Sequence, residues 1–443
     1  MIERYCTPGM TAIWSRQAKT QRWLDVEIAI CEGWHRAGVI PAEDLKAIQE
    51  RSKFDLDRCD EIEEVTRHDL MAFVRNVSEN VSGVPAIGEG SEGDGTPNPA
   101  RWIHFGVTSY DVIDTALGMM MRDSLDVLKA SVETLCGTIS ALHKEHGHHP
   151  CIGRTHGIHA EPITFGHKCE GWRNELERSL KRIAQARVEI AVGKVSGAVG
   201  IRAHVTPELE ASICESLGLS ADPSSTQIIA RDRHAHVLNV LATLAGSLER
   251  IATELRNLQR TEILEVQEAF AKGQTGSSAM PHKRNPWNSE TVCGLARLVR
   301  ANAHAMQESV MTWHERDLTN SSLERIVFPD TFQLTDFMVH RLNRILAGLV
   351  VMPENMLRNL RQMGDLVFSE HVMVALIQSG MSREAAYKVA QRNAARAWDG
   401  HDFRTSVTED EDVKARLSAE QIEEIFNLDH HLRHAPAPPH VGK

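Results

Sequence analysis

The segment that begins at Asp232 carries a continuous helical seam without a proline. Its apolar residues recur at alternating spacings of three and four: Val237, Leu241, Leu244, Leu248, Ile251, Leu255 and Leu258. This spacing is typical of a helix that packs nearly parallel to its neighbours. The pattern extends over roughly 30 residues, whereas a globular helix averages about 11–12 residues. A chain with such a segment is predicted to build its core from long helices.

Four further stretches have comparable length and periodicity: Tyr110–His146, Ala160–Ile190, Pro286–Arg316 and Ile326–Val351. Five long helices with short connections predict an all-α fold around an elongated bundle. The patterns before and after these helices are shorter. We therefore predict three domains, namely an N-terminal helical domain at 1–108, a central long-helix bundle at 109–352 and a C-terminal helical domain at 353–443.

Composition narrows the classes of function. The net charge of −11 argues against general binding of nucleic acid, but it leaves room for a local cationic pocket. None of the eight cysteines forms a C-x-x-C pair, so reduced thiols in a cytosolic protein are the simplest interpretation. No apolar run approaches the length of a membrane span, about 20 residues, and we expect a cytoplasmic protein without membrane contact.

The loop Gly273–Pro286, GQTGSSAMPHKRNP, joins two of the long stretches. Asn285 is a good helix cap and Pro286 suits the first helical position, where free N–H groups attract anions. Lys283 adds a full positive charge. The small residues Gly276–Ser278 allow a ligand to approach closely and let the loop move. The composition fits a lid that closes over an anion, and a solvated interhelical turn stays an open alternative.

Other polar motifs are spread along the chain. They hold His68 in TRHDLMAF; His104, Thr108, Ser109 and Asp111 in HFGVTSYD; Thr155, His156 and His159 in GRTHGIHAEP; Gln227, Arg231 and Arg233 in STQIIARDRHA; and Arg316, Ser321 and Arg325 in HERDLTNSSLER. Each motif also has a structural explanation. The residues after Val107 are suited to cap a helix, a lone histidine is more often a packing residue, and the arginines after Ala230 can pair with nearby acids.

The loop sequence GSSAMPHKRNP resembles the signature GSSxMPxKxNP of the fumarase/aspartase superfamily. The motifs MIERY, TRHD, HFGVTSYDVIDTA, GRTHGIHAEPITFG, RDRHA and WHERDLTNSSLER are together similar to the adenylosuccinate lyase family. They extend from residue 1 to residue 325, and the C-terminal region is compatible. The resemblance therefore covers essentially the whole chain.

This resemblance implies a fumarase/aspartase-like fold whose central helices merge into a twenty-helix core in a homotetramer, with active sites shared between subunits. It implies a β-elimination that releases fumarate from two purine precursors, adenylosuccinate, which gives AMP, and SAICAR, which gives AICAR. It implies no metal and no other cofactor. His143, His146, His148 and His149 imitate a metal cluster, but we interpret them as the end of a helix and its turn.

The resemblance also assigns catalytic roles. The proton to be removed lies beside a carboxylate and is weakly acidic, so the reaction needs a base, an acid for the departing nitrogen and positive groups for the dianion formed. By the match, Ser277 is the base and Lys283 helps to lower its pKa. His156 is the general acid and Glu290 orients it. His68 corresponds to a substrate-binding histidine that has also been considered as the acid.

The implied substrate contacts form two sets. Those to the succinyl group and its surroundings are His104, Thr108, Ser109, Thr155, Gln227, Lys283 and Asn285. Those to the nucleotide phosphate are Arg4, Tyr5, Arg316, Ser321 and Arg325. Arginine suits the second role because its planar fork binds phosphate in a bidentate manner.

Two alternatives are weighed against this function. Another superfamily lyase, such as argininosuccinate lyase or aspartase, would not need the phosphate set. A non-catalytic helical scaffold on the same fold would not need Ser277, Lys283, His156 and Glu290 together. The segment Ser82–Ala100, rich in Gly, Pro and acids, is expected to form an exposed insertion near the His104 motif.

Overall fold

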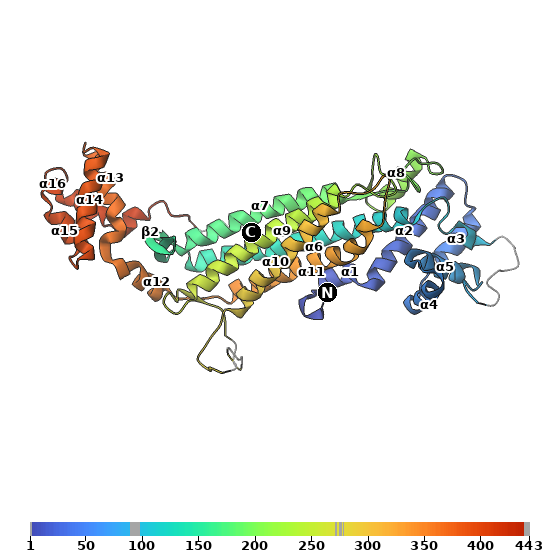
Figure 1. The fold of residues 1–443 in the computed structure, drawn as a ribbon, viewed down its shortest axis with the longest axis horizontal. Coiled ribbons are helices and arrows are strands. Elements are labelled where there is room, and N and C mark those ends of the chain that lie inside the picture. The colour runs from blue at the N-terminus through green and yellow to red at the C-terminus, as the bar shows by residue number, and fades with distance from the viewer. Residues whose placement is uncertain (1, 89–97, 271–272, 274–276, 278, 438–443) are drawn as a thin grey trace. The chain divides into compact units, whose positions relative to one another are not determined.

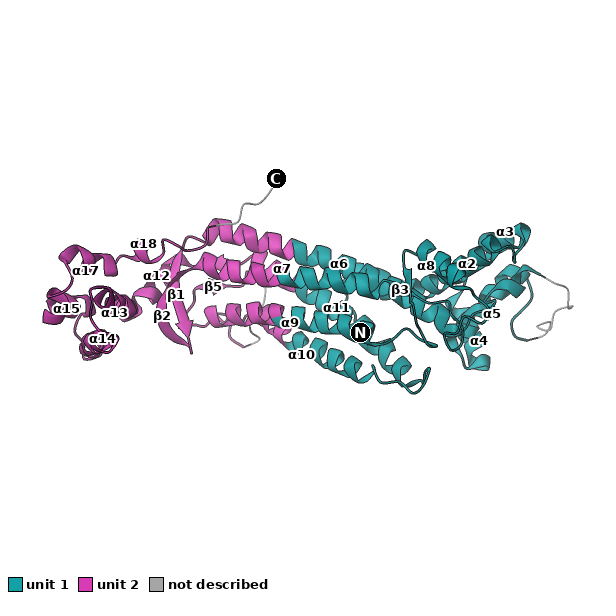
Figure 2. Cartoon of the chain, turned by 90° about the horizontal axis from the view of Figure 1, so that it is seen from above, with its two compact units in different colours: residues 1–133, 178–246, 294–340 teal, residues 134–177, 247–293, 341–443 magenta. Residues whose placement is uncertain are grey.

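A computed structural model describes residues 2–88, 98–270, 273, 277 and 279–437 of the 443-residue chain (Figure 1). It is mostly helical, and the strands found in this part of the chain form three two-stranded sheets. Two compact units are present (Figure 2). Unit 1 holds residues 1–133, 178–246 and 294–340, and unit 2 holds 134–177, 247–293 and 341–443. The central part of the expected insertion, 89–97, lies outside the described residues.

Five long helices contribute to both units, and the predicted all-α class with a long-helix bundle is confirmed. They are α6 (Ser109–His146), α7 (Phe165–Ile190), α9 (Asp232–Leu258), α10 (Trp287–Glu308) and α11 (Thr319–Ala347). Every residue of the α9 seam is at most 2% exposed. In unit 1 the segments of these helices are also cross-linked by polar contacts, such as Ser131 to Asp336 at 2.8 Å. In unit 2 a corresponding bond joins Lys168 to Glu254 at 2.7 Å.

Several predicted helix boundaries were wrong. The stretch Ala160–Thr164 is not helical, because it belongs to strand β2 (Ile158–Thr164), which pairs antiparallel with β1 (Pro150–Thr155). Helix α10 stops at Glu308 rather than continuing to Arg316. Helix α11 begins at Thr319 and includes Pro329, so it starts before the predicted Ile326. The predicted division into three domains stays a prediction.

The remainder of unit 1 consists of shorter elements around one apolar core. They are η1 (Glu3–Tyr5), α1 (Pro8–Trp14), α2 (Arg16–Arg36), α3 (Ala42–Arg51), α4 (Leu56–Thr66), α5 (Asp69–Ser82), η2 (Pro99–Trp102), α8 (Pro207–Ser216) and the parallel strands β3 (Val192–Gly193) and β4 (Ser220–Ala221). Helix α2 is longer than the sequence pattern predicted. Its buried face, with Trp23 and Ile30, packs in this core with Phe73 and Val77 of α5.

The C-terminal elements of unit 2 surround a second apolar core. The remaining elements of this unit are β5 (Val266–Gln267) with its antiparallel partner β6 (Val350–Val351), α12 (Pro353–Leu360), η3 (Arg361–Phe368), α13 (Ser369–Gln378), α14 (Arg383–Trp398), α15 (Phe403–Glu409), α16 (Glu411–Lys414), α17 (Ala419–Ile425) and α18 (Leu428–His431). Phe368, Phe403 and Phe426 pack edge to face within the core. No helix of the described residues is both long and apolar enough to cross a membrane.

A buried ion cluster connects three helices of unit 1. The Arg231 guanidinium, just before α9, donates to Asp114 of α6 at 2.7 and 2.9 Å and to Glu324 of α11 at 2.8 and 3.1 Å. The arginine and aspartate side chains are fully buried, and that of Glu324 is 8% exposed. Asp114 also accepts the Ile229 N–H. Removing one member would leave a buried charge without its partner, which is far more costly than losing a surface pair.

We predict that Asp114→Asn lowers the free energy of unfolding by about 3–5 kcal/mol. The reason is that the neutral amide cannot balance the Arg231 charge while it remains buried. The measurement is the urea midpoint followed by circular dichroism. Glu423→Gln is the matched control, because its pair with Arg404 is exposed and should change stability by less than about 1 kcal/mol. Equal losses in the two variants would contradict a structural role for the cluster.

Candidate active site

Three residues of the predicted substrate site meet around Tyr110 in unit 1. The Arg316 guanidinium carbon lies 3.5 Å from the centroid of the Tyr110 ring. Arg316 also donates from Nη1 to Oε1 of Gln227 at 3.0 Å. The Tyr110 hydroxyl is hydrogen-bonded to Ser321, in the first turn of α11. Burial raises the pKa of Tyr110, so the ring remains neutral beneath the cation.

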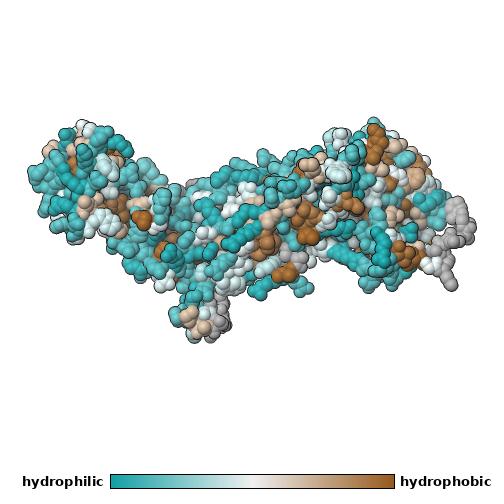
Figure 3. Space-filling view, viewed as in Figure 1, coloured by the Kyte–Doolittle hydropathy of each residue, from teal (hydrophilic) through white to brown (hydrophobic). Residues whose placement is uncertain are grey.

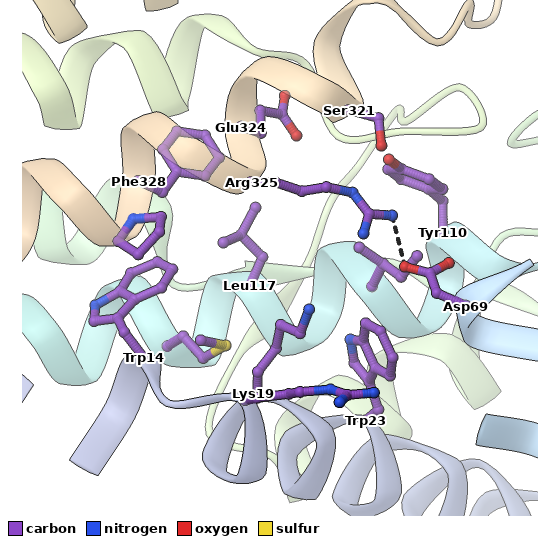
Figure 4. Close-up of a pocket in the computed structure, with 14 residues that line it drawn as sticks. Trp14, Lys19, Trp23, Asp69, Tyr110, Leu117, Ser321, Glu324, Arg325 and Phe328 are labelled. Carbon is purple, nitrogen blue, oxygen red and sulfur yellow. Dashed lines mark hydrogen bonds and ion pairs between the residues drawn. The ribbon is translucent and has the colours of Figure 1, made fainter. Parts of the chain in front are cut away.

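Arg325 lies one helical turn after Ser321 and reaches the start of α5 (Figure 4). Its Nη2 donates to Oδ2 of Asp69 at 2.6 Å. His68 precedes this aspartate as the cap of α5, where its Nδ1 accepts the Met71 N–H at 3.4 Å. The residues between the predicted stretches Pro286–Arg316 and Ile326–Val351 are thus helical from Thr319 onward, and Ser321 and Arg325 share one face of α11.

The Asp111 carboxylate connects the start of α6 to the backbone turn at Ser196 and Gly197 through hydrogen bonds. It accepts the Thr108 N–H at 2.8 Å and the N–H groups of Ser196 and Gly197 at 3.1 and 3.2 Å. Lys194 forms a fully buried ion pair with the same carboxylate. The capping explanation for Thr108 and its neighbours therefore describes the local structure. The contacts of Asp111 also fix the backbone from which Thr108 and Ser109 would contact a ligand.

His104 is bound at two points by a buried carboxylate. Glu27 of α2 accepts the His104 backbone N–H at 2.9 Å and contacts its Nδ1 at 2.6 Å. The residue has a positive φ of 63°, a left-handed conformation that this pair of contacts holds. Burial alone would lower the pKa of His104, but the hydrogen bond and charge of Glu27 outweigh it and raise the pKa.

Ser277 lies in unit 2 with its hydroxyl beneath two backbone donors. Its Oγ accepts the N–H groups of Ala279 and Met280 at 3.3 and 3.1 Å. Donors in this arrangement favour negative charge on the oxygen. The neighbouring residues Met280–Pro286, together with Glu290, line a cavity of about 1030 Å³ beside the end of α9. Gly276 and Ser278 lie outside the described residues.

The helix after this loop starts differently from the prediction. Helix α10 begins at Trp287, so Pro286 precedes the first helical residue instead of occupying it. Glu268 accepts the Ser289 N–H at 2.8 Å, its hydroxyl at 2.6 Å and the Asn288 amide at 2.8 Å. A carboxylate of the chain itself thus satisfies the helix start, where we had predicted free N–H groups for a ligand.

His156 lies at the tip of the β1–β2 hairpin. It and Gly157 have φ values of 56° and 80° and form the two-residue turn between Thr155 and Ile158. A non-glycine residue with positive φ is uncommon, and such conformations concentrate at functional sites. Within the described part of unit 2, no hydrogen bond or ion pair joins His156, Ser277 and Glu290 to one another. The structure brings Lys283, Asn285 and Glu290 together but leaves His156 apart from them in contacts.

Arg4 and Tyr5 do not lie beside the other residues predicted to bind the nucleotide phosphate. Tyr5 packs edge-on against Phe337, with 5.1 Å between ring centroids, and Arg4 is exposed. Phe337 lies 12 residues beyond Arg325 on α11, which corresponds to about 18 Å of helix. As for metals, no group of three histidine, cysteine or acidic residues in the described parts of the chain is placed to hold an ion. His143 of the suspected cluster is buried beside Gly147 and Gly166.

Comparisons with known proteins agree on one family. The model of the family described as Lyase matches residues 4–301, and the model described as Adenylosuccinate lyase C-terminus matches residues 365–438. Curated relatives named adenylosuccinate lyase are 48% identical in Synechocystis and 46% identical in Bacillus subtilis. Each alignment covers 98% of this chain and 97% of the relative. The chain belongs to the adenylosuccinate lyase family.

The wider fold relationship extends to a solved structure of a fumarate lyase from Mesorhizobium. It is 25% identical with a TM-score of 0.85, and the match covers 98% of this chain and 96% of that one. The sequence matches and the structural match therefore agree that this member of the adenylosuccinate lyase family has the fumarase superfamily fold.

Sequence reasoning missed several residues that shape this candidate site. Tyr110 supports Arg316, Glu27 holds His104, and Asp69 binds Arg325. Tyr110 and Asp69 are adjacent to predicted residues, so proximity to a motif was an available signal. Glu27 is 77 residues from His104 and lies inside an ordinary helical pattern, so nothing local marked it.

The His104–Glu27 contact predicts a pH-dependent stability. Because the folded pKa of His104 is raised above its ordinary value of about 6.5, the contact stabilises fully below that value. The contribution is lost as the pH rises through the folded pKa. The difference in urea midpoint between wild type and Glu27→Gln should therefore be larger at pH 6 than at pH 9. Glu50→Gln, at an exposed pair with Lys46, is the control, and a pH-independent Glu27 effect would contradict the prediction.

Proposed function

We propose that this chain cleaves adenylosuccinate to AMP and fumarate, and SAICAR to AICAR and fumarate, by β-elimination. The observation that carries the proposal is the match over 98% of the chain to curated relatives named adenylosuccinate lyase. The eight free cysteines fit a cytoplasmic location, where thiols stay reduced. The reaction described here needs proton transfer and electrostatic stabilisation, and we assign no cofactor to it.

In this proposal Ser277 removes the proton beside the succinyl carboxylate. A serine hydroxyl is a weak base until it is deprotonated, so its surroundings must favour the alkoxide. The N–H groups of Ala279 and Met280 already point at Oγ and would stabilise that charge. Lys283 follows in the same loop and lines the adjacent cavity. Its positive charge would support both the alkoxide and the dianion that forms when the proton leaves.

His156 would protonate the departing nitrogen. His156 is exposed at the tip of the hairpin. A general acid needs this access, because it must reach a substrate that lies outside its own strand pair. We assign Glu290, at the start of α10, to orient this histidine. His68 would contact the substrate from the cap of α5. These roles follow from the family motifs, and the backbone conformation of His156 and the hydrogen bonds to Ser277 Oγ are consistent with them.

The substrate contacts divide by chemistry. Arg316, Ser321 and Arg325 would bind the phosphate, and Arg4 and Tyr5, which lie apart from them in this chain, would reach it from another subunit. His104, Thr108, Ser109, Thr155, Gln227 and Asn285 would bind the succinyl group and its surroundings. The stacking of Arg316 on Tyr110 and its bond to Gln227 preorganise one phosphate ligand. Argininosuccinate lyase and aspartase, whose substrates carry no phosphate, would have no use for this arrangement.

We further propose a homotetramer with active sites shared between subunits. Large apolar residues are exposed in unit 1, among them Leu298 of α10 and Ile326 of α11 at 52% and 62% exposure, and Leu318 just before α11 at 70%. Figure 3 shows hydrophobic residues, in brown, on the face of the molecule in view. Exposed apolar residues on neighbouring helices are typical of interaction surfaces. The lack of a described contact between His156 and Ser277 within unit 2 also fits a site that another chain completes.

The function is tested by following the absorbance change of adenylosuccinate with the purified protein. We predict turnover by the wild type and a roughly 10²–10⁴-fold lower kcat for Ser277→Ala, the usual effect of losing a positioned acid–base group. Substrate binding should survive in this variant. A near-normal kcat in Ser277→Ala would move the base role elsewhere. Absence of turnover by the wild type with either substrate would favour the scaffold alternative.

Site sharing is tested by mixing two inactive variants. His156→Ala and Ser277→Ala subunits, refolded together from mild denaturant, should recover part of the wild-type activity, because some hybrid sites would contain neither mutation. Each variant refolded alone is the control and should stay inactive. Mixed tetramers verified by mass, without any recovery, would count against shared sites.

A further inference from the structure

A cavity of about 250 Å³ lies beside the proposed phosphate residues of unit 1 (Figure 4). Elements α2, α5, α6 and α11 all contribute to its lining. Trp14, Leu117 and Phe328 make one part of the wall apolar, while Ser321 and Arg325 lie at its polar side. Lys19 of α2 projects into the same cavity. Family motifs gave no role to this lysine.

The carboxylates that line the cavity already accept hydrogen bonds from other groups of the chain. Asp69 accepts from Arg325 at 2.6 Å and from the Leu70 N–H at 2.8 Å. Glu324 accepts from Arg231 and, at 3.0 Å, from Asn320. Among the described residues, no hydrogen bond or ion pair reaches the Lys19 ammonium. Its contact is with the Trp23 ring, whose centroid lies 4.8 Å away.

This position is unfavourable for a lone cation. Burial lowers the pKa of Lys19 and the positive charge of Arg325 lowers it further, while the charges of Asp69 and Glu63 offset these effects only in part. The apolar wall removes the water that would otherwise solvate the ammonium, and the aromatic ring compensates only in part. An anion bound between Lys19 and Arg325 would remove both penalties. The cavity is therefore better suited to a charged ligand than to water.

We propose that Lys19 is a further cation of the phosphate subsite and receives the phosphate group of the nucleotide substrate together with Ser321 and Arg325. The inference rests on the proposed function, because that function places a phosphate at Ser321 and Arg325. Lysine binds phosphate as a point charge and needs no fixed fork, which suits a flexible side chain that crosses from α2.

The charged and titratable groups that face Lys19 determine how the affinity for the nucleotide phosphate should depend on pH. They are Arg16 on α2, Glu63 on α4, Asp69 on α5, Tyr110 on α6, and Glu324 and Arg325 on α11. The phosphate itself is a dianion above about pH 7. Over the alkaline range below the ordinary lysine pKa, the affinity of the wild type for AMP should fall as Lys19 loses its proton, because burial lowers the pKa of Lys19. Lys19→Arg, whose guanidinium keeps its charge, should lose much less over this range.

The experiment compares Lys19→Met and Lys19→Arg with Lys46→Met, a control at an exposed lysine of α3. Calorimetry on the purified full-length proteins at pH 7.5 measures the Kd values of AMP, adenosine and inorganic phosphate. Lys19→Met should weaken AMP binding roughly 10- to 100-fold, the scale of one hydrogen bond to a charged group, and adenosine binding less than about threefold. For adenylosuccinate the KM should rise while kcat changes little, because the phosphate is bound equally in the ground and transition states.

The outcomes separate the two proposals. Wild type that neither binds AMP nor turns over adenylosuccinate overturns the function and the Lys19 role together. Active wild type with AMP affinity unchanged in Lys19→Met overturns only the Lys19 role. Equal losses for AMP and adenosine also overturn it, because they would indicate general damage. Inorganic phosphate that binds as tightly as AMP would show a free-anion site and overturn assignment to the nucleotide. Should Lys19→Met fail to fold, identical pH profiles of wild type and Lys19→Arg overturn the role.

Discussion

The organisation of unit 1 depends on one buried guanidinium. Arg231 is bonded to α6 through Asp114 and to α11 through Glu324, and it immediately precedes α9. Glu324 lies between Ser321 and Arg325 in sequence, so the same ion cluster fixes the turn of α11 that presents the proposed phosphate ligands. A buried pair of this kind is a weak source of net stability, but its geometry is specific because each member needs the other. The cluster therefore sets the position of functional side chains that it does not touch.

Unit 2 uses buried carboxylates in a related way. Glu265 is fully buried, binds Arg154 of β1 at 2.6 Å and accepts the Asn359 amide of α12 at 2.9 Å. Glu268, three residues later, satisfies the start of α10. One short segment thus joins the hairpin that carries His156, the helix that carries Glu290 and the C-terminal helices. The segments that carry the proposed acid and its partner are each held by structural charges, while His156 and Glu290 themselves are exposed.

The sequence predicted those features that depend on neighbours along the chain. The α9 seam, the fold class and the family motifs all repeat or cluster locally. The hairpin was missed because Ile158–Thr164 runs directly into α7, and its apolar residues are compatible with either period. The contacts of Arg231 with Asp114, 117 residues away, were also invisible, because pairing across that distance follows from tertiary packing alone. The proposed site residues come from motifs, and the residues that support them were not predicted.

The same limit explains why residue type alone does not separate the arginines of two motifs, although the family resemblance assigned only Arg316 to the phosphate. Arg231 and Arg316 both sit among polar residues before a long helix, yet the first is fully buried between two carboxylates. The second stacks on Tyr110 and has an amide, not a carboxylate, as its described partner. A cation whose charge is already neutralised has little to offer an anionic substrate, whereas one held in place by a ring and an amide retains its charge for the ligand. Lys19 falls in the second group by the same criterion. For Arg231, Arg316 and Lys19, the counter-charges, more than the residue type, separate the cation that holds helices together from those proposed to bind substrate. Arg325 lies between the two groups, because one of its nitrogens is bonded to Asp69.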